Sequence, residues 1–277
     1  MIPVEFEYKK AITVEEALAA LSAGDSKLLA GGYSLIPAMK LRLNQPSVLI
    51  DIGDIPSLKG IKEENGEIVI NAGTTHSDIL HNDIIKNHLP FFSQAANLIG
   101  DIQVRNRGTI GGSLAHADPA ADWPALVLAA NATIDVASSG GKRSIKATDF
   151  FTEMFSTALQ ENEIITAIRI PVPVNGARSV YLKFENPASR FAVVGCAVFR
   201  FPDGKINIAF TGVAASAFRD VGAEQKVSGK PLDAETINDA VNAAVNGVSI
   251  LGDNFASEDY RKHLAKVYLK RALQAVA

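Results

Sequence analysis

The sequence predicts a globular protein of mixed helices and strands, in two parts that meet near residues 171–178. Its 277 residues, of which 47% are hydrophobic and 21% charged, are enough to bury a substantial core. Helical and strand patterns are mixed before Pro171-Val-Pro173, whereas a run of strands and then a run of helices follow it. This change in the order of the predicted elements is the reason for expecting a domain boundary there.

The first part is expected to begin with a helix. Thr13-Val-Glu-Glu16 has the capping-box pattern, and apolar residues follow it at helical spacing. Apolar segments bounded by turn residues predict further strands over 27–30, 48–52, 68–72, 132–136 and 164–170. Two more helices are expected, over 90–99 and from Asp122 or Pro124 through Ala130.

The second part is expected to start with three strands, over 180–184, 193–201 and 206–212. Asp203-Gly204 lies between the last two and is typical of a hairpin turn. Helices are predicted over 234–245 and 257–275. The apolar face of the last helix is expected to carry Leu264, Val267, Tyr268 and Leu273.

Composition argues against several classes of protein. A net charge of −3 does not provide the basic face that a nucleic-acid-binding protein needs. No segment approaches the ~20 apolar residues of a membrane span, and the first residues lack a signal-peptide pattern, so the expected location is cytoplasmic. The single cysteine, Cys196, lies in an apolar run and is expected in the core, since one thiol cannot hold an iron–sulfur cluster.

A glycine pair follows the first predicted strand of residues 27–30. Gly31-Gly32 is followed by Ser34, which can cap a helix, with Pro37 near the first turn of that helix. Adjacent glycines can present successive N–H groups without a Cβ in the way, and such groups bind anions. The strand–loop–helix pattern therefore favours a phosphate site, although a tight turn or helix cap would give the same pattern.

A second glycine pair lies in the segment Arg107-Gly-Thr-Ile-Gly111-Gly112-Ser-Leu-Ala-His116-Ala-Asp118. Its spacing is not that of a Rossmann fingerprint, and no Gly-Lys-Ser/Thr closes a P-loop. Two glycine segments in one chain suggest one large ligand held at two places, such as a dinucleotide. The ligand-free alternative, a pair of structural turns, stays open on the pattern alone.

With both motifs described, the chain resembles the FAD-binding medium subunits of the molybdenum hydroxylases, the family of xanthine dehydrogenase and aerobic carbon monoxide dehydrogenase. The family motif Ala-Gly-Gly-x-Ser-Leu-Leu-Pro-x-Met-Lys is matched by residues 30–40. The longer motif Gln-Val-Arg-Asn-x-Gly-Thr-Ile-Gly-Gly-Asn/Ser-Leu-x-x-Ala-x-Pro-x-x-Asp is matched from Gln103 to Asp122. The resemblance extends over essentially the whole chain.

The resemblance implies an α+β fold in two domains. Residues 1–173 would form an FAD-binding domain of the vanillyl-alcohol oxidase/MurB (PCMH) type, with subdomains of about 1–53 and 54–173. Residues 174–277 would form a small α+β domain with a three-stranded antiparallel sheet. FAD would lie extended between these parts.

The resemblance also implies partners and a direction of electron flow. A large subunit would carry a molybdenum–pterin centre, and a small subunit would carry two [2Fe-2S] clusters that reduce the FAD of this chain. NAD or another acceptor would then take the electrons, and the complex would be a dimer of heterotrimers. The substrate stays open between a purine or other N-heterocycle, an aldehyde and carbon monoxide.

The residues expected at the cofactor are carried over from the family motifs and their flanks. They are Lys27, Leu28, Leu29, Ala30, Gly31, Gly32, Tyr33, Ser34, Leu35, Ile99, Thr109, Gly112, Ser113, Ala115, His116, Ala121, Asp122, Ile165 and Lys183. The first nine would surround the pyrophosphate, and Asp122 would accept hydrogen bonds from a ribose. Lys183 would lie near the flavin, with a solvated strand lysine as the alternative. No catalytic residue and no metal ligand are assigned to this chain, and a metal held by His116, Asp118 and Asp122 is the rejected alternative.

Two departures from the family pattern concern the flavin edge. Arg190-Phe191 stands where the family often has an acid followed by an aromatic residue, and Tyr33 stands where Gln or His is common. Two other functions are kept as alternatives. One is a self-sufficient FAD oxidase of the same superfamily, and the other is a flavin-free assembly or sensor subunit.

Overall fold

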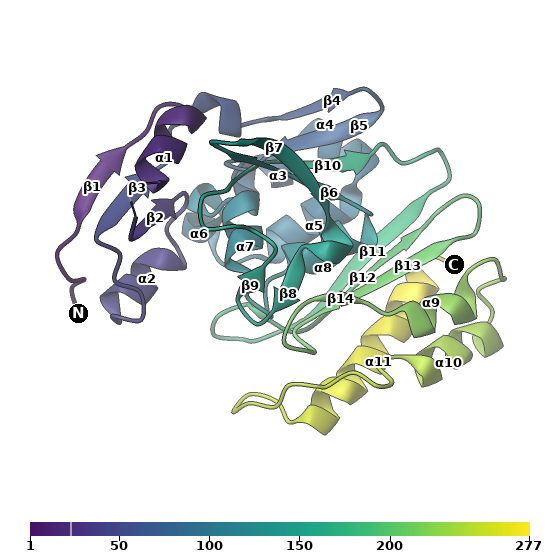
Figure 1. The fold of residues 1–277 in the computed structure, drawn as a ribbon. Helices are drawn as coiled ribbons and strands as arrows, with labels where there is room; N and C mark the ends of the chain where they lie inside the picture. Colours follow the sequence, from purple (N-terminus) through teal and green to yellow (C-terminus); the bar gives the residue numbers. More distant parts are fainter. Residues whose placement is uncertain (23) are drawn as a thin grey trace.

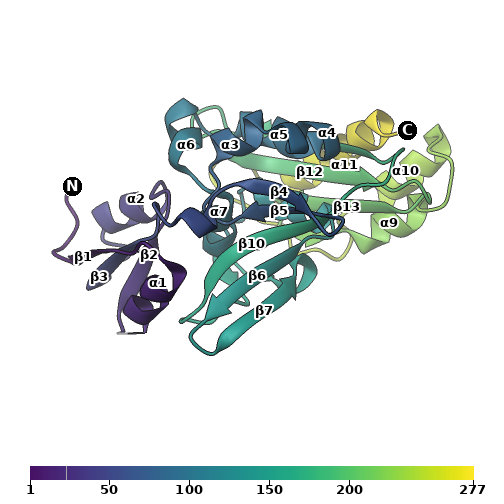
Figure 2. The same cartoon turned by 90° about the horizontal axis from the view of Figure 1, so that it is seen from above.

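The computed structural model describes residues 1–22 and 24–277. These residues form three units, each built from a β-sheet with helices. A small unit of residues near the N-terminus lies at one end and the C-terminal helices lie at the other (Figures 1 and 2). No helix in the described part of the chain is long and apolar enough to cross a membrane. The predicted mixture of helices and strands is confirmed.

The N-terminal unit is a three-stranded parallel sheet with two helices. Its strands β1 (Glu7–Lys10), β2 (Ser26–Leu29) and β3 (Val48–Asp51) have the order β1-β3-β2. Helix α1 (Val14–Leu21) begins as predicted, because the Thr13 hydroxyl accepts the Glu16 N–H at 3.1 Å. Helix α2 (Leu35–Lys40) follows the first glycine pair, but Ser34 makes no side-chain cap bond, so that detail of the prediction is wrong.

A five-stranded antiparallel sheet forms the middle unit, in the order β4-β5-β10-β6-β7. The expected strands near 68–72, 132–136 and 164–170 are its members β5, β6 and β10. The bounds of its strands are β4 (Ile61–Glu64), β5 (Glu67–Asn71), β6 (Thr133–Ser138), β7 (Gly141–Lys146) and β10 (Ile164–Pro171). A two-stranded ribbon, β8 (Phe151–Glu153) with β9 (Ser156–Thr157), precedes β10.

Helices cover this unit and connect its strands. They are α3 (His76–His81), α4 (Asp83–His88), α5 (Pro90–Leu98), α6 (Ile102–Arg107), α7 (Ile110–His116) and α8 (Trp123–Ala129), with single 3-10 turns at Pro56–Leu58 and Ala147–Asp149. Helices α5 and α8 confirm the predictions for residues 90–99 and 122–130. Helix α7 was not predicted, and it contains the second glycine pair.

The C-terminal unit is an antiparallel sheet with helices on both faces. Its strands are β11 (Arg178–Glu185), β12 (Ala192–Arg200), β13 (Ile206–Thr211) and the short β14 (Phe218–Arg219). The expected three-stranded sheet is therefore extended by a fourth, two-residue strand at its edge. The hairpin turn at Asp203-Gly204 is confirmed, and Gly204 takes a φ of +85° there.

Helices α5 and α8 pack on one face of this sheet. The other side is covered by α9 (Val221–Val227), α10 (Ala234–Ala243) and α11 (Glu258–Ala275). Because both faces are covered, nearly every residue of β12 is buried. Cys196 is fully buried in this strand, as expected, and burial raises the pKa of its thiol. On α11 the predicted face is partly wrong, since Val267 and Tyr268 are half-buried and Leu269 and Ala272 are fully buried instead.

Candidate functional site

A cleft of about 1140 Å³ lies where the N-terminal unit meets the rest of the molecule. Its walls come from both glycine segments, from the residues around Ile99-Gly100 after α5, and from the turn between β11 and β12. Ligand sites in proteins usually measure ~300–1,000 Å³, so this cleft can hold a ligand of dinucleotide size. The two motifs that were singled out in the sequence thus lie in one site.

The first glycine segment lines this cleft with backbone rather than side chains. Strand β2 ends at Leu29, and Gly32 has a φ of +82°, a left-handed conformation that favours glycine. Within the described chain, the backbone N–H groups of residues 31–35 have no hydrogen-bond partner. Five successive N–H groups without partners at a cleft wall are a site for an anion.

The second glycine segment is built differently, because its N–H groups are used by the fold. The Thr109 hydroxyl caps α7 by accepting the Gly112 N–H at 3.1 Å, and Gly111 donates to the Ala72 carbonyl at 2.8 Å. A Cβ on Gly111 would lie 2.5 Å from the Ala72 Cβ. The N–H groups of this pair are thus already bonded within the protein. Gly111 permits close packing of α7 on the segment after β5, whereas Gly112 lines the cleft beside Ala30.

The two glycine segments also touch each other. A Cβ on Gly31 would lie 2.3 Å from the Arg107 carbonyl oxygen and 2.8 Å from the Gly108 Cα. Glycine at position 31 is thus required for the two loops to meet. Their contact fixes the floor of the cleft.

The structure brings together nearly all of the residues expected at the cofactor. Leu29 and Lys183 do not line the cleft, and the other seventeen do. Those seventeen are Lys27, Leu28, Ala30, Gly31, Gly32, Tyr33, Ser34, Leu35, Ile99, Thr109, Gly112, Ser113, Ala115, His116, Ala121, Asp122 and Ile165. Among the described residues, no group of three or more His, Cys, Asp or Glu side chains lies close enough together to bind a metal ion.

Asp122, which lines the cleft, forms a buried ion pair with Lys183. The Lys183 ammonium donates to Asp122 Oδ2 at 3.1 Å, to the Leu98 carbonyl at 2.9 Å and to the Arg190 carbonyl at 2.8 Å. Tyr181 donates its hydroxyl to Asp122 Oδ1 at 2.5 Å. Burial raises the pKa of the Asp122 carboxyl, and the Lys183 charge and the Tyr181 hydrogen bond oppose that rise.

Lys183 is thus neither a solvated strand lysine nor a side chain that lines the cleft. All three of its ammonium protons are used inside the protein, and its side chain is 1% exposed. It joins the end of α5, the start of α8 and the turn after β11. These are three parts of one wall of the cleft.

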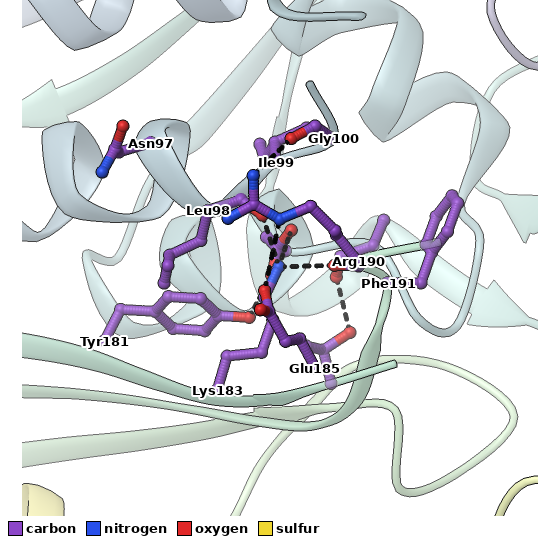
Figure 3. A network of polar contacts seen from close by, with 12 residues as sticks. Asn97, Leu98, Ile99, Gly100, Tyr181, Lys183, Glu185, Arg190 and Phe191 are labelled. Carbon is purple, nitrogen blue, oxygen red and sulfur yellow. Dashed lines mark hydrogen bonds and ion pairs between the residues drawn. The ribbon is translucent and has the colours of Figure 1, made fainter. Parts of the chain in front are cut away.

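Arg190 holds the turn between β11 and β12 in place. Its guanidinium donates to the Gly100 carbonyl at 2.8 Å, and its φ is +61°. Glu185 lies 3.5 Å from the same guanidinium (Figure 3). Phe191, the next residue, is 44% exposed and lines the cleft, so an aromatic ring is available at this wall as the family pattern suggested.

His76 is a cleft residue that sequence analysis missed. It is the first residue of α3, and its Nδ1 accepts the indole N–H of Trp123 at 3.1 Å. Burial, with a smaller contribution from Arg105, lowers the pKa of His76 to about 4. The capping box Thr75-His-Ser-Asp78 was visible in the sequence, but nothing in it indicates that His76 meets Trp123 47 residues away.

The lowered pKa of His76 predicts a loss of stability in acid. The unfolded chain binds a proton at His76 below about pH 6.5 and the folded chain only near pH 4, so stability falls as the pH falls between these values. At pH 4.5 this difference in proton binding at His76 is expected to lower the free energy of unfolding by roughly 2 kcal/mol. Urea unfolding of the wild type and of His76→Gln at pH 7.0 and 4.5 measures this effect. An equal loss of unfolding free energy in both proteins between these pH values would contradict the prediction.

Comparison with known proteins agrees with this architecture. Residues 4–173 match the model of the FAD binding domain in molybdopterin dehydrogenase, and residues 179–276 match the CO dehydrogenase flavoprotein C-terminal domain. The chain is 41% identical to the carbon monoxide dehydrogenase medium chain of Hydrogenophaga pseudoflava, over 99% of this chain and 98% of that one. This chain belongs to the FAD-binding medium subunits of the molybdenum hydroxylases.

Other relatives support this membership. The glyceraldehyde dehydrogenase medium chain of Sulfolobus acidocaldarius is 38% identical over the full length of both chains. A solved structure of carbon monoxide dehydrogenase from Hydrogenophaga pseudoflava superposes with a TM-score of 0.96, at 42% identity, covering 100% of this chain and 98% of that one. Medium chains named for different substrates are thus similar in sequence to this chain over nearly their whole length, and the resemblance inferred from the two glycine motifs is confirmed.

Proposed function

We propose that this chain is the FAD-carrying electron-transfer subunit of a multi-subunit molybdenum hydroxylase. It accepts electrons from the [2Fe-2S] clusters of a small partner subunit and passes them to NAD or another acceptor. A large subunit with a molybdenum–pterin centre oxidises the substrate. The complex is a dimer of heterotrimers in the cytoplasm, and this chain divides at residues 173/174 into an FAD domain and a smaller C-terminal domain.

The observation that carries this proposal is the row of N–H groups at residues 31–35, which find no partner in residues 1–22 and 24–277 and lie on the wall of a cleft of dinucleotide size. These groups fit the negative charge of a pyrophosphate. Thr109 and Ser113 add hydroxyl groups to the same cleft, and Ile99 and Ile165 add apolar surface for aromatic rings. The residues present therefore fit FAD.

In this proposal the chain binds and orients the cofactor, and the flavin supplies the electron-transfer chemistry. Residues 27–28 and 30–35 surround the pyrophosphate, and Thr109, Gly112, Ser113, Ala115, His116 and Ala121 complete the binding site. Asp122 is available to a ribose only through lone pairs that Tyr181 and Lys183 leave free. Lys183 acts on the site indirectly, by holding Asp122 and the turn at Arg190.

We assign the choice of substrate to the large subunit rather than to this chain. Relatives named for carbon monoxide and for glyceraldehyde are both about 40% identical to it over nearly their whole length. Flavin subunits of such similar sequence in enzymes of different name favour a substrate site elsewhere. No acid–base dyad or nucleophile of this chain is needed.

The deciding experiment is a visible absorption spectrum of the purified chain, followed by release of the cofactor by heat and its mass determination. We expect flavin absorption and free FAD at about one molecule per chain. Folded protein that stays colourless after incubation with excess FAD would refute the proposal and favour the flavin-free alternative. A flavin that stays attached after denaturation would favour the self-sufficient oxidase.

A further inference from the structure

His76 is held in one orientation at the floor of the cleft. Its backbone N–H donates to the Gly108 carbonyl at 3.0 Å, and its Nδ1 accepts from Trp123 Nε1 at 3.1 Å. Trp123 is fully buried and packs against Phe92, with 5.5 Å between ring centroids. Because an indole N–H can only donate, Nδ1 carries no proton and the neutral imidazole has its proton on Nε2.

Gly108 leaves this Nε2–H open to the cleft. A Cβ at position 108 would lie 2.6 Å from His76 Nε2 and would cover it. His76 and Gly108 both line the cleft, and no acceptor in residues 1–22 or 24–277 takes a hydrogen bond from Nε2. A donor of fixed direction therefore faces a space that is large enough for an acceptor.

The opening lies beside the first glycine segment. The Gly108 Cα is 2.8 Å from the place where a Gly31 Cβ would be, so the two backbones are in contact there. The N–H groups that have no partner among the described residues begin at Gly31 and continue to Leu35. Backbone donors on one side and the imidazole donor on the other thus converge on the same part of the cleft.

The imidazole acts there as a neutral donor. His76 is only 5% exposed, and burial together with Arg105 lowers its pKa to about 4, which favours the uncharged form. A neutral N–H contributes direction and one hydrogen bond, whereas a cation would have to be desolvated at this depth. Such a donor suits an anion whose charge is already balanced by several N–H groups.

We propose that His76 is a cofactor-binding residue whose Nε2–H donates a hydrogen bond to the diphosphate of FAD. Trp123 fixes the tautomer, and Gly108 provides the opening through which the phosphate oxygen reaches the ring. This inference rests on the proposed FAD site. It assigns the diphosphate to the junction of the two glycine segments.

Affinity measurements on variants test this assignment. His76→Phe removes the donor, His76→Gln keeps an amide donor, and His81→Gln is the control on an exposed face of the same helix. For His76→Phe we expect FAD and ADP to bind about tenfold more weakly, which is the effect of one lost hydrogen bond, and riboflavin to bind as in the wild type. His76→Gln is expected to recover most of the loss, and His81→Gln to equal the wild type.

The single tryptophan of the chain gives a second readout that needs no variant. Trp123 is hydrogen-bonded to His76, so ADP that accepts a hydrogen bond from His76 Nε2–H is expected to shift the tryptophan emission. Riboflavin analogues, which have no phosphate, are expected to leave this emission unshifted. With ¹⁵N-labelled histidine, the His76 Nε2–H cross-peak, identified by its absence in His76→Gln, is expected to move when ADP is added.

An unmoved His76 cross-peak at saturating ADP would overturn the assignment, as would wild-type ADP affinity in folded His76→Phe. Both results are distinguishable from failure of the proposed function. If the proposed function were wrong, the wild type itself would bind neither FAD nor ADP.

Discussion

Replacing Gly31 with alanine is expected to weaken FAD binding strongly. The added Cβ would lie 2.3 Å from the Arg107 carbonyl oxygen and 2.8 Å from the Gly108 Cα. Both neighbours are backbone, so neither can turn away as a flexible side chain could. The two glycine segments must separate, and the row of N–H groups then no longer meets the floor of the cleft.

We expect the FAD dissociation constant of Gly31→Ala to rise at least ~100-fold, which corresponds to about 2.7 kcal/mol. Titration of the apo-protein with FAD measures it, and circular dichroism establishes that the variant is folded. Gly140→Ala is the matched control, because its Cβ would meet nothing closer than 3.7 Å and Gly140 does not have a left-handed φ. FAD affinity within threefold of the wild type in Gly31→Ala would show that the two loops can separate without cost.

Elements that carry their own start and stop residues were predictable from the sequence. Helix α1 begins at the predicted Thr13 cap, α11 begins after the Ser257 cap, and the β12–β13 hairpin turns at Asp203-Gly204. In each case a local hydrogen bond to the backbone determines the boundary. Such bonds involve residues two or three positions apart, so a sequence pattern contains all of the information.

Helix α7 could not be predicted in the same way, because its first turn contains Gly111 and Gly112. Glycine disfavours a helix by about 1 kcal/mol relative to alanine, so local propensity argues against this helix. Its position depends on Gly111 lying against Ala72, nearly forty residues earlier. Here the tertiary contact decides the local structure.

The lining of the cleft was predictable from the sequence as a set of residues, but the contacts that these residues make were not. Resemblance to a family placed seventeen of nineteen residues at one cleft. It did not reveal that Lys183 is fully used by Leu98, Asp122 and Arg190, which come from three separate elements. The contact between His76 and Trp123 is likewise a meeting of distant segments, which one sequence without its fold cannot show.

Replacing Lys183 with methionine is expected to cost about 3–5 kcal/mol of unfolding free energy, since it leaves the Asp122 carboxylate buried without its counter-ion. Asp122→Asn added to Lys183→Met should recover at least half of that loss, because an amide does not need a counter-ion. Urea unfolding of both variants, with the exposed Lys270→Met as control, gives these values. Equal stability of the single and double variants would mean that the Asp122 charge is not the source of the cost.

The pH dependence of the Lys183→Met variant separates a lost charge pair from lost packing. Lys183 lowers the pKa of Asp122 against the effect of burial, so without it that pKa rises further. The folded variant then binds a proton that the unfolded chain, with an ordinary carboxyl pKa of about 3.9, does not bind until lower pH. The deficit relative to wild type should therefore shrink as the pH falls from 7 to 5. A lost packing contact would give the same deficit at both pH values, and the acid loss from His76 cancels because wild type and variant share it.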